Sequence, residues 1–298
     1  MLDFVYYPVS AILWLWHTAF GFVLGPASGL SWVLSVVFLV LTVRAALFAP
    51  FLKQARTQAT MKMLQPQVKA IQQKYKSDTV KRNTELQKLY KDNNVKVFGT
   101  ILPMLAQLLV FLGLFHVLRS FDRTGTHIPF LPSGPTMSPE QNAATPNYLF
   151  SAEDVRSFLD AEIFGVPLSA TMTTAGELLT TVALITVPLM LIAAVATHFT
   201  ARTSMNRQEP TAQLALMRPL SLWVFPAFAL IGGVVLPVAI LLYFVTNNAC
   251  TFAQQHLVYR RMDAETAAAA QRVAEARAHT APKPGAKPIR RPKQAQRK

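Results

Sequence analysis

Charged residues and cysteine are scarce in this sequence. Of its 298 residues 15% are charged and 52% are hydrophobic, and the mean hydropathy is +0.29. A soluble globular domain carries about 25% charged residues, so the composition argues against a soluble protein. The single cysteine, Cys250, excludes an intrachain disulfide and a CxxC metal site. Redox chemistry is therefore not expected.

The groups that intramembrane enzymes need are also missing. None of the six histidines begins an HExxH motif, and the sequence has no Walker or dinucleotide-binding glycine loop. All fifteen acidic residues lie outside the long apolar runs or at their edges. A buried carboxylate pair, or the acidic relay of a proton-coupled or sodium-coupled transporter, is therefore not expected. We predict that the chain is not an enzyme and needs no metal or cofactor.

What the sequence does contain is a series of uncharged apolar runs of about twenty residues, the length that a hydrocarbon core requires. A transmembrane β-barrel would instead show segments of about ten residues with alternating polarity. The sequence thus predicts an all-α, multi-pass integral membrane protein. The expected segments are an N-terminal aromatic helix (1–29), five spans (30–52, 97–118, 177–199, 218–234 and 236–258), a cytoplasmic helical hairpin (53–96), an external loop with a short helix (119–176), a cytoplasmic loop (200–217) and a basic tail (259–298).

The basic residues indicate how these segments are oriented. The net charge is +14, with eleven Lys and Arg between Lys53 and Lys96 and eleven more between Arg260 and Lys298. Residues 119–176 hold only three basic residues against six acidic ones. Because basic loops stay on the cytoplasmic side, we expect the N-terminus outside and the C-terminus inside the cell membrane.

The first apolar segment, residues 4–25, leaves two possibilities open. Its aromatic residues, among them Tyr6, Tyr7, Trp14 and Trp16, are typical of a helix that lies at the membrane interface. A sixth spanning helix is the alternative, and the charge distribution does not separate the two.

Two short patterns predict helices outside the spans. Residues 53–94 are polar with an apolar seam of 3-4 spacing, which is typical of a helix that packs on a partner helix. This seam consists of Met61, Leu64, Val68, Ile71 and Tyr75. In the external loop, Ser151 and Asp154 fit a capping box at the start of a short helix.

One permanent charge, Arg44, interrupts the first predicted span. It precedes Lys53 by nine residues, which is about 13 Å of continuous helix, farther than its side chain reaches. A central arginine costs about 2.5 to 3.5 kcal/mol on insertion scales, and the spans offer no carboxylate to pair with it. We expect a wet cavity around Arg44 that leaves its charge free for an anion. Neutral polar residues that could line this cavity are Gln107, Thr197, His198, Thr246, Asn247 and Asn248, with Gln254 and Gln255 nearer the cytoplasm.

At these positions the chain resembles the YidC family of membrane protein insertases, and most of all its actinobacterial members. The resemblance covers roughly residues 4–260. It rests on four stretches in this order: "VRAALFAPFLKQARTQATMKMLQPQVKAIQQKYK", "ELQKLYKDNNV", "ILPMLAQLLVFLGLFHVLR" and "LPVAILLYFVTNNACTFAQQHL".

The resemblance implies a five-helix insertase core around a hydrophilic groove that opens to the cytoplasm, with an N-terminal interfacial helix. Arg44 matches the family's groove arginine, which attracts acidic groups of a nascent chain. The implied groove residues are Arg44, Gln107, Thr197, His198, Tyr243, Phe244, Thr246 and Asn247.

The implied partners are nascent membrane proteins, the lipid bilayer and, through the basic tail, the ribosome. The Sec translocon and the signal recognition particle receptor are further candidates, and no DNA partner is expected. A channel or anion transporter that uses Arg44 as its selectivity charge is the competing function. An RNA-binding adaptor is a third class, supported by the tail alone.

Overall fold

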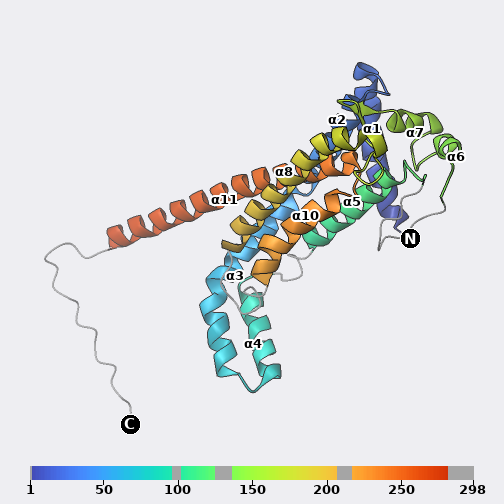
Figure 1. Cartoon of the computed structure of the whole chain (residues 1–298). Helices are drawn as coiled ribbons and strands as arrows, with labels where there is room; N and C mark the ends of the chain where they lie inside the picture. Colours follow the sequence, from blue (N-terminus) through green and yellow to red (C-terminus); the bar gives the residue numbers. More distant parts are fainter. Residues whose placement is uncertain (1, 96–101, 125–135, 207–216, 281–298) are drawn as a thin grey trace, which may run out of the picture. The chain divides into compact units, whose positions relative to one another are not determined.

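A computed structural model describes residues 2–95, 102–124, 136–206 and 217–280 of the chain (Figure 1). The chain divides into two compact units, Met1–Gln255 and His256–Lys298. The first residues of the predicted cytoplasmic loop (200–217) are helical up to Asn206, where the preceding helix ends. Residues 207–216 of that loop, the first residues of the span predicted at 97–118 and the basic tail from residue 281 lie outside the described residues.

Helices make up nearly all of the regular structure. They are α1 (Asp3–Leu24), α2 (Gly29–Ala46), α3 (Phe48–Lys74), α4 (Thr79–Asp92), α5 (Leu102–Arg119), α6 (Pro139–Ala144), α7 (Ala152–Leu159), η2 (Gly176–Leu178), α8 (Leu179–Asn206), η3 (Leu220–Val224), α10 (Phe225–Gly233) and α11 (Val238–Thr280). A two-stranded antiparallel hairpin, β1 (Glu162–Ile163) and β2 (Val166–Pro167), lies between α7 and η2.

Three helices among the described residues are long and apolar enough to cross a membrane. They are Asp3–Leu24, Gly29–Ala46 and Gly176–Asn206, and two shorter apolar helices cover Leu105–Arg119 and Met217–Gly233. A mostly helical membrane protein is confirmed, but the predicted all-α fold is not fully correct, because the short β-hairpin β1–β2 is also present. The number of five spans stays a prediction, because three of the described helices have the length and hydropathy needed to cross a membrane.

The apolar run of residues 30–52 is divided near Leu47, where α2 ends and α3 begins. Pro50 explains this position, because proline has no N–H to bond the carbonyl of Ala46 and its ring crowds that carbonyl. The backbone bonds resume with the N–H of Phe51, which donates to the carbonyl of Leu47 at 3.0 Å. Arg44 therefore lies in the last turn of α2 and not in the middle of one long helix.

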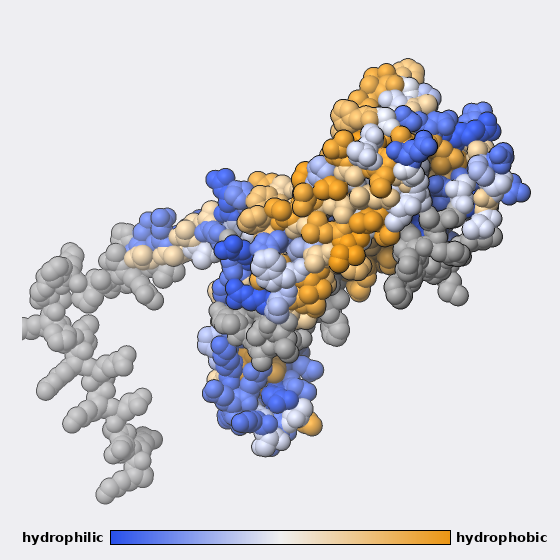
Figure 2. Space-filling model, in the orientation of Figure 1, coloured by the Kyte–Doolittle hydropathy of each residue, from blue (hydrophilic) through white to orange (hydrophobic). Residues whose placement is uncertain are grey.

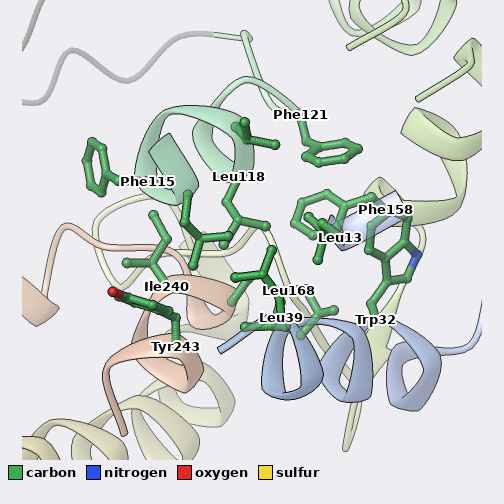
Figure 3. Close-up of a cluster of buried hydrophobic side chains, with 14 of the residues drawn as sticks. Leu13, Trp32, Leu39, Phe115, Leu118, Phe121, Phe158, Leu168, Ile240 and Tyr243 are labelled. Carbon is green, nitrogen blue, oxygen red and sulfur yellow. The ribbon is translucent and has the colours of Figure 1, made fainter. Parts of the chain in front are cut away.

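The main core joins the helices to the segment that follows α5 (Figure 3). Trp32 of α2 is fully buried against Phe121, Phe150 and Phe158, with ring centroids 5.1 to 5.5 Å from its own. Phe150 and Phe158 come from residues 136–170, which we call the cap. These residues were expected to be mostly loop, but they bury large side chains and so form a folded part of the protein.

Local hydrogen bonds explain how the cap folds. The capping box predicted at Ser151 and Asp154 is confirmed at the start of α7. A second capping box, between Ser138 and Gln141, starts α6, which the sequence analysis did not predict.

The cap also closes the ends of two helices. The side chain of Asn147 donates to the carbonyl of Val117 in the last turn of α5 at 3.0 Å, and that of Asn142 donates to the carbonyl of Phe121 just after this helix at 2.9 Å. At the start of α11, the N–H groups of Val238 and Ala239 donate to the carbonyls of Ala170 and Leu168. These helix-end groups would otherwise lack partners, so the cap and the two helices stabilise each other.

Helix α1 touches the cap near both of its ends. Near the N-terminal end, the ring of Tyr7 lies 5.4 Å from that of Tyr148, and Ser10 Oγ accepts from the N–H of Leu149. Just after the C-terminal end, the carbonyl of Pro26 accepts from Ser157 Oγ at 2.6 Å. Along its length, Gly113 of α5 packs so closely on Val5 that an added Cβ would lie 2.8 Å from a methyl group of that valine.

Helices α3 and α4 contact each other and form the helical hairpin. Leu64 and Val68 of the predicted seam are buried, while Ile71 and Tyr75 are partly buried. Asp78 ends the turn by accepting from the N–H of Lys81 at the start of α4.

The contact between the cap and α2 gives the first testable prediction. A Cβ on Gly29 would lie 1.9 Å from the carbonyl oxygen of Glu162, so Gly29→Ala must push β1 away from the start of α2. We expect a loss of about 2 kcal/mol of stability, measured as a lower thermal midpoint in detergent. The matched control is Gly232→Ala, where the nearest atom lies 3.9 Å away. Equal midpoints for the two variants would contradict this packing.

Candidate functional site

Arg44 is bound by one face of α11. Its Nη2 donates to Asn247 Oδ1 at 2.7 Å and to Thr251 Oγ1 at 2.5 Å, and its Nη1 donates to Gln254 Oε1 at 3.2 Å. The carbonyl of Asn247 is a further acceptor at 3.4 Å. Residues 247, 251 and 254 share one helix face because they are four and three positions apart. The last turn of α2 is thereby fixed to α11.

A third helix joins at Asn247. Gln107 of α5 donates from Nε2 to Asn247 Oδ1 at 3.3 Å, so one amide oxygen accepts from both Gln107 and Arg44. Asn247 is partly buried and belongs to the first unit, like every other residue of this cluster. We call Arg44, Gln107, Asn247, Thr251 and Gln254 the arginine cluster.

The acceptors that the described residues offer Arg44 are all neutral. Amide and hydroxyl oxygens orient a guanidinium without cancelling its charge, and the buried Nε–H of Arg44 has no acceptor in the described part of the chain. A carboxylate would bind more strongly than these groups, since it accepts two parallel hydrogen bonds and supplies the opposite charge. The cluster is therefore suited to bind an anionic group that is not its own.

Two aromatic residues named in the sequence analysis lie next to the cluster on α11. Tyr243 is 2% exposed and stacks on Phe111 of α5, with ring centroids 6.0 Å apart. Phe244 lies 5.4 Å from the same ring. Both residues help to pack α11 against α5 one turn before Asn247.

The other three predicted groove residues have different partners. Thr197 donates to the carbonyl of Ala193 in its own helix and lies 3.3 Å from Asn248 Oδ1. Thr246 donates to the carbonyl of Leu242 in its own helix at 2.8 Å. Of the eight residues, the structure therefore brings Arg44, Gln107 and Asn247 together by direct hydrogen bonds.

His198 has a structural partner that the sequence could have indicated. Its Nδ1–H donates to the carbonyl of Leu222 at 2.8 Å. This carbonyl is four residues before Pro226, which has no N–H to bond it, and the helix forms a π turn there. His198 thus joins α8 to η3.

Thr251 is the one member of the cluster that the sequence analysis did not name. The signal was its position one helical turn after Asn247, since residues four apart share a face. No group of three or more His, Cys, Asp or Glu side chains in the described ranges is placed to hold a metal ion.

The fold and the cluster define a class: a multi-pass helical membrane protein with an arginine held among neutral polar groups where α2, α5 and α11 meet. Comparison with known proteins agrees with this class and identifies the family. The family model described as "60Kd inner membrane protein" matches residues 23–265. The membrane protein insertase YidC of Mycobacterium tuberculosis is 47% identical over 305 residues, which cover 99% of this chain and 82% of that protein.

More distant relatives carry the same name. The membrane protein insertase YidC of Mycobacterium leprae is 44% identical, with 96% of this chain and 77% of that protein covered. That of Streptomyces avermitilis is 30% identical, with 87% and 58% covered. The chain belongs to the YidC family of membrane protein insertases, and its function is not enzymatic.

The shared acceptor in the cluster can be tested directly. Asn247→Ala would remove the oxygen that accepts from both Arg44 and Gln107, leaving two partly buried donors short of a partner. We expect a loss of about 2 kcal/mol of stability, measured by thermal unfolding in detergent. The control is Thr246→Val, since among the described residues the hydroxyl of Thr246 bonds the carbonyl of Leu242 in its own helix. A smaller loss for Asn247→Ala than for Thr246→Val would contradict the described contacts.

Proposed function

We propose that this protein inserts newly made membrane proteins into the cell membrane and helps them fold, with Arg44 attracting acidic groups of the substrate. The observation that carries the proposal is the positive charge of Arg44, held by neutral acceptors at the junction of α2, α5 and α11. An incoming carboxylate would replace Asn247 Oδ1 and Thr251 Oγ1 as the acceptor of Nη2. The arginine cluster is then the wall of a hydrophilic groove that opens to the cytoplasm.

The energy for insertion would come from the substrate. Each methylene that moves from water into lipid contributes about 0.8 kcal/mol, so an apolar helix favours the bilayer strongly. The obstacle is the polar tail that has to cross with it. A groove that holds the tail near Arg44 would shorten the hydrocarbon path and needs no nucleotide.

The proposed topology has five spans, an external N-terminus and a cytoplasmic C-terminus. The charge distribution of the sequence supports it, because the basic hairpin α3–α4 and the basic tail both belong on the cytoplasmic side. Figure 2 agrees with a hairpin outside the hydrocarbon, since the visible face of α3 and α4 is polar while that of the bundle is largely apolar.

The same topology makes α1 an interfacial helix on the external side. A spanning helix has its ends about 30 Å apart on opposite membrane surfaces. Both end regions of α1 contact the cap, at Tyr148 and at Ser157. These contacts favour a helix that follows one membrane surface over one that crosses the bilayer.

Further partners are part of the proposal. The hairpin α3–α4 would receive the substrate or a targeting component, with the Sec translocon and the signal recognition particle receptor as candidates. The basic tail would contact the ribosome.

Substituting the arginine tests the role of its charge. We expect Arg44→Ala to reduce insertion of a single-span substrate with an acidic tail about tenfold, which corresponds to the loss of one charge-assisted interaction of about 1.5 kcal/mol. The same substrate with Asn in place of Asp should be affected much less, and Arg44→Lys should largely preserve insertion of both. The measurement is protease protection of the substrates in liposomes that contain each variant.

Two results would contradict the proposal. Equal loss for acidic and neutral tails would mean that Arg44 hydrates the groove and does not pair with the substrate. Flux of ions or small anions through the liposomes, without any insertion of the substrate, would support the channel or anion transporter.

The role of the tail can be tested by deletion of residues 264–298. Because ribosomal RNA is recognised through its phosphates, removing these basic residues should weaken ribosome binding and reduce its salt dependence. Insertion of a small substrate by the truncated protein should continue. Sedimentation of ribosomes with liposomes at increasing salt measures the first effect, and unchanged binding would exclude the tail as the ribosome contact.

A further inference from the structure

The turn of the β-hairpin in the cap carries an exposed aromatic side chain on a strained backbone. The register pairs Glu162 with Pro167 and Ile163 with Val166, which leaves Phe164 and Gly165 as a two-residue turn. Both have positive φ, 52° and 75°, which is the type I′ pattern. This conformation suits Asn, Asp or Gly and is rare for a residue as large as phenylalanine.

Packing within the protein does not explain this choice. Phe164 is 88% exposed, whereas Ala161, Val166 and Leu168 around it are at most 1% exposed. The hairpin thus buries its base in the core and holds one aromatic ring outside it. The backbone of Phe164 is unfavourable, and its large apolar side chain is exposed. This combination indicates that the side chain has a function of its own.

The hairpin is fixed against the connection between α1 and α2. The carbonyl of Glu162 lies against Gly29, at the start of α2. Two hydrogen bonds hold α7 to the same place, from Trp32 Nε1 to Ser157 Oγ at 3.1 Å and from Ser157 Oγ to the carbonyl of Pro26 at 2.6 Å. Phe164 therefore follows by two residues the contact that Glu162 makes with the start of α2.

The surface at this connection is apolar. Phe22 and Val23 at the end of α1 are 93% and 76% exposed, and Leu30 at the start of α2 is 53% exposed. Figure 2 shows apolar colours at the end of the molecule where α1 meets α2. Both helices are long and apolar enough to cross a membrane, so lipid is the partner that suits the exposed apolar side chains at their junction.

We propose that Phe164 is a membrane anchor whose ring enters the lipid leaflet on the side of the cap, next to Phe22, Val23 and Leu30. Aromatic and large apolar side chains at the edge of the hydrocarbon bind the bilayer there. The anchor keeps the cap on the membrane surface and steadies the ends of α5 and α11 that the cap closes. The proposed topology enters this proposal only in deciding that the leaflet is the external one. The role of Arg44 does not enter it.

A depth measurement tests the anchor. The full chain, in a Cys250→Ser background whose thermal midpoint in detergent equals that of the natural protein, would carry Phe164→Cys labelled with an environment-sensitive fluorophore. It would be reconstituted in vesicles of phosphatidylglycerol and phosphatidylethanolamine. The matched control is Glu140→Cys on the exposed surface of the cap. We expect lipid-borne nitroxide to quench the label at 164 several times more strongly than the label at 140, and aqueous iodide to do the reverse.

Two outcomes would overturn the anchor. Equal quenching by iodide at both positions would place Phe164 in water, and protection of position 164 from both quenchers would indicate a protein partner. Because the readout is depth and not insertion, it is independent of the substrate experiments on Arg44.

A second variant separates the side chain from the turn. Phe164→Asn replaces phenylalanine with a residue that adopts positive φ more readily, so in detergent the thermal midpoint of the variant should equal or exceed that of the natural protein. In lipid nanodiscs the same variant should show faster amide hydrogen exchange in residues 161–168, because the anchor is lost. Unchanged exchange in nanodiscs would overturn the proposal.

Discussion

The hydrogen bonds from Arg44 to α11 are the interaction on which the proposed function depends. They hold the end of α2 against one face of α11 through Asn247, Thr251 and Gln254, and Gln107 brings α5 to the same point. Neutral partners lower the cost of keeping a guanidinium among apolar helices but leave its charge uncompensated. The cluster therefore joins three helices, and in the proposed function it would exchange its acceptors for a carboxylate of the substrate.

The cap supports this arrangement from the other end of the same helices. It supplies acceptors to the first N–H groups of α11 and donors to the last carbonyls of α5. It also shares the aromatic core around Trp32 with α2. Each helix that contributes to the arginine cluster is thus fixed by the cap as well. A substrate that loosens the bonds of Arg44 would leave these distant contacts in place.

Much of the cluster could be predicted from the sequence by one physical argument. A charge or an amide within an apolar run needs a polar partner, and this argument selected Arg44, Gln107 and Asn247. The same argument could not tell which polar side chains hydrogen-bond outside the cluster. Thr246 bonds its own helix, and His198 bonds the carbonyl that Pro226 leaves free. Thr251 was missed because a threonine in a helix usually bonds its own backbone, as this one also does.

The fold was predictable where local signals are strong. The capping box at Ser151 marked α7, and the apolar seam marked the hairpin arm that became α3. Pro50 indicates that the first apolar run divides near Leu47. The run was predicted as one span because its composition is apolar on both sides of this position. The β-hairpin had no such signal, because its strands have two residues each and its turn is Phe-Gly in place of the usual Asn-Gly.

The most direct test of the central claim is site-specific photo-crosslinking from the wall of the proposed groove, first in the protein with Arg44 and then in Arg44→Ala. A crosslinker at position 107 would be presented to ribosome-bound nascent chains stalled with their tail inside the membrane, and one at the exposed position Leu184 of α8 would serve as the reference. The account predicts crosslinks from position 107 to an Asp in the tail that are largely lost in Arg44→Ala. Crosslinks to acidic and neutral tails that are equal and unaffected by Arg44→Ala would contradict it.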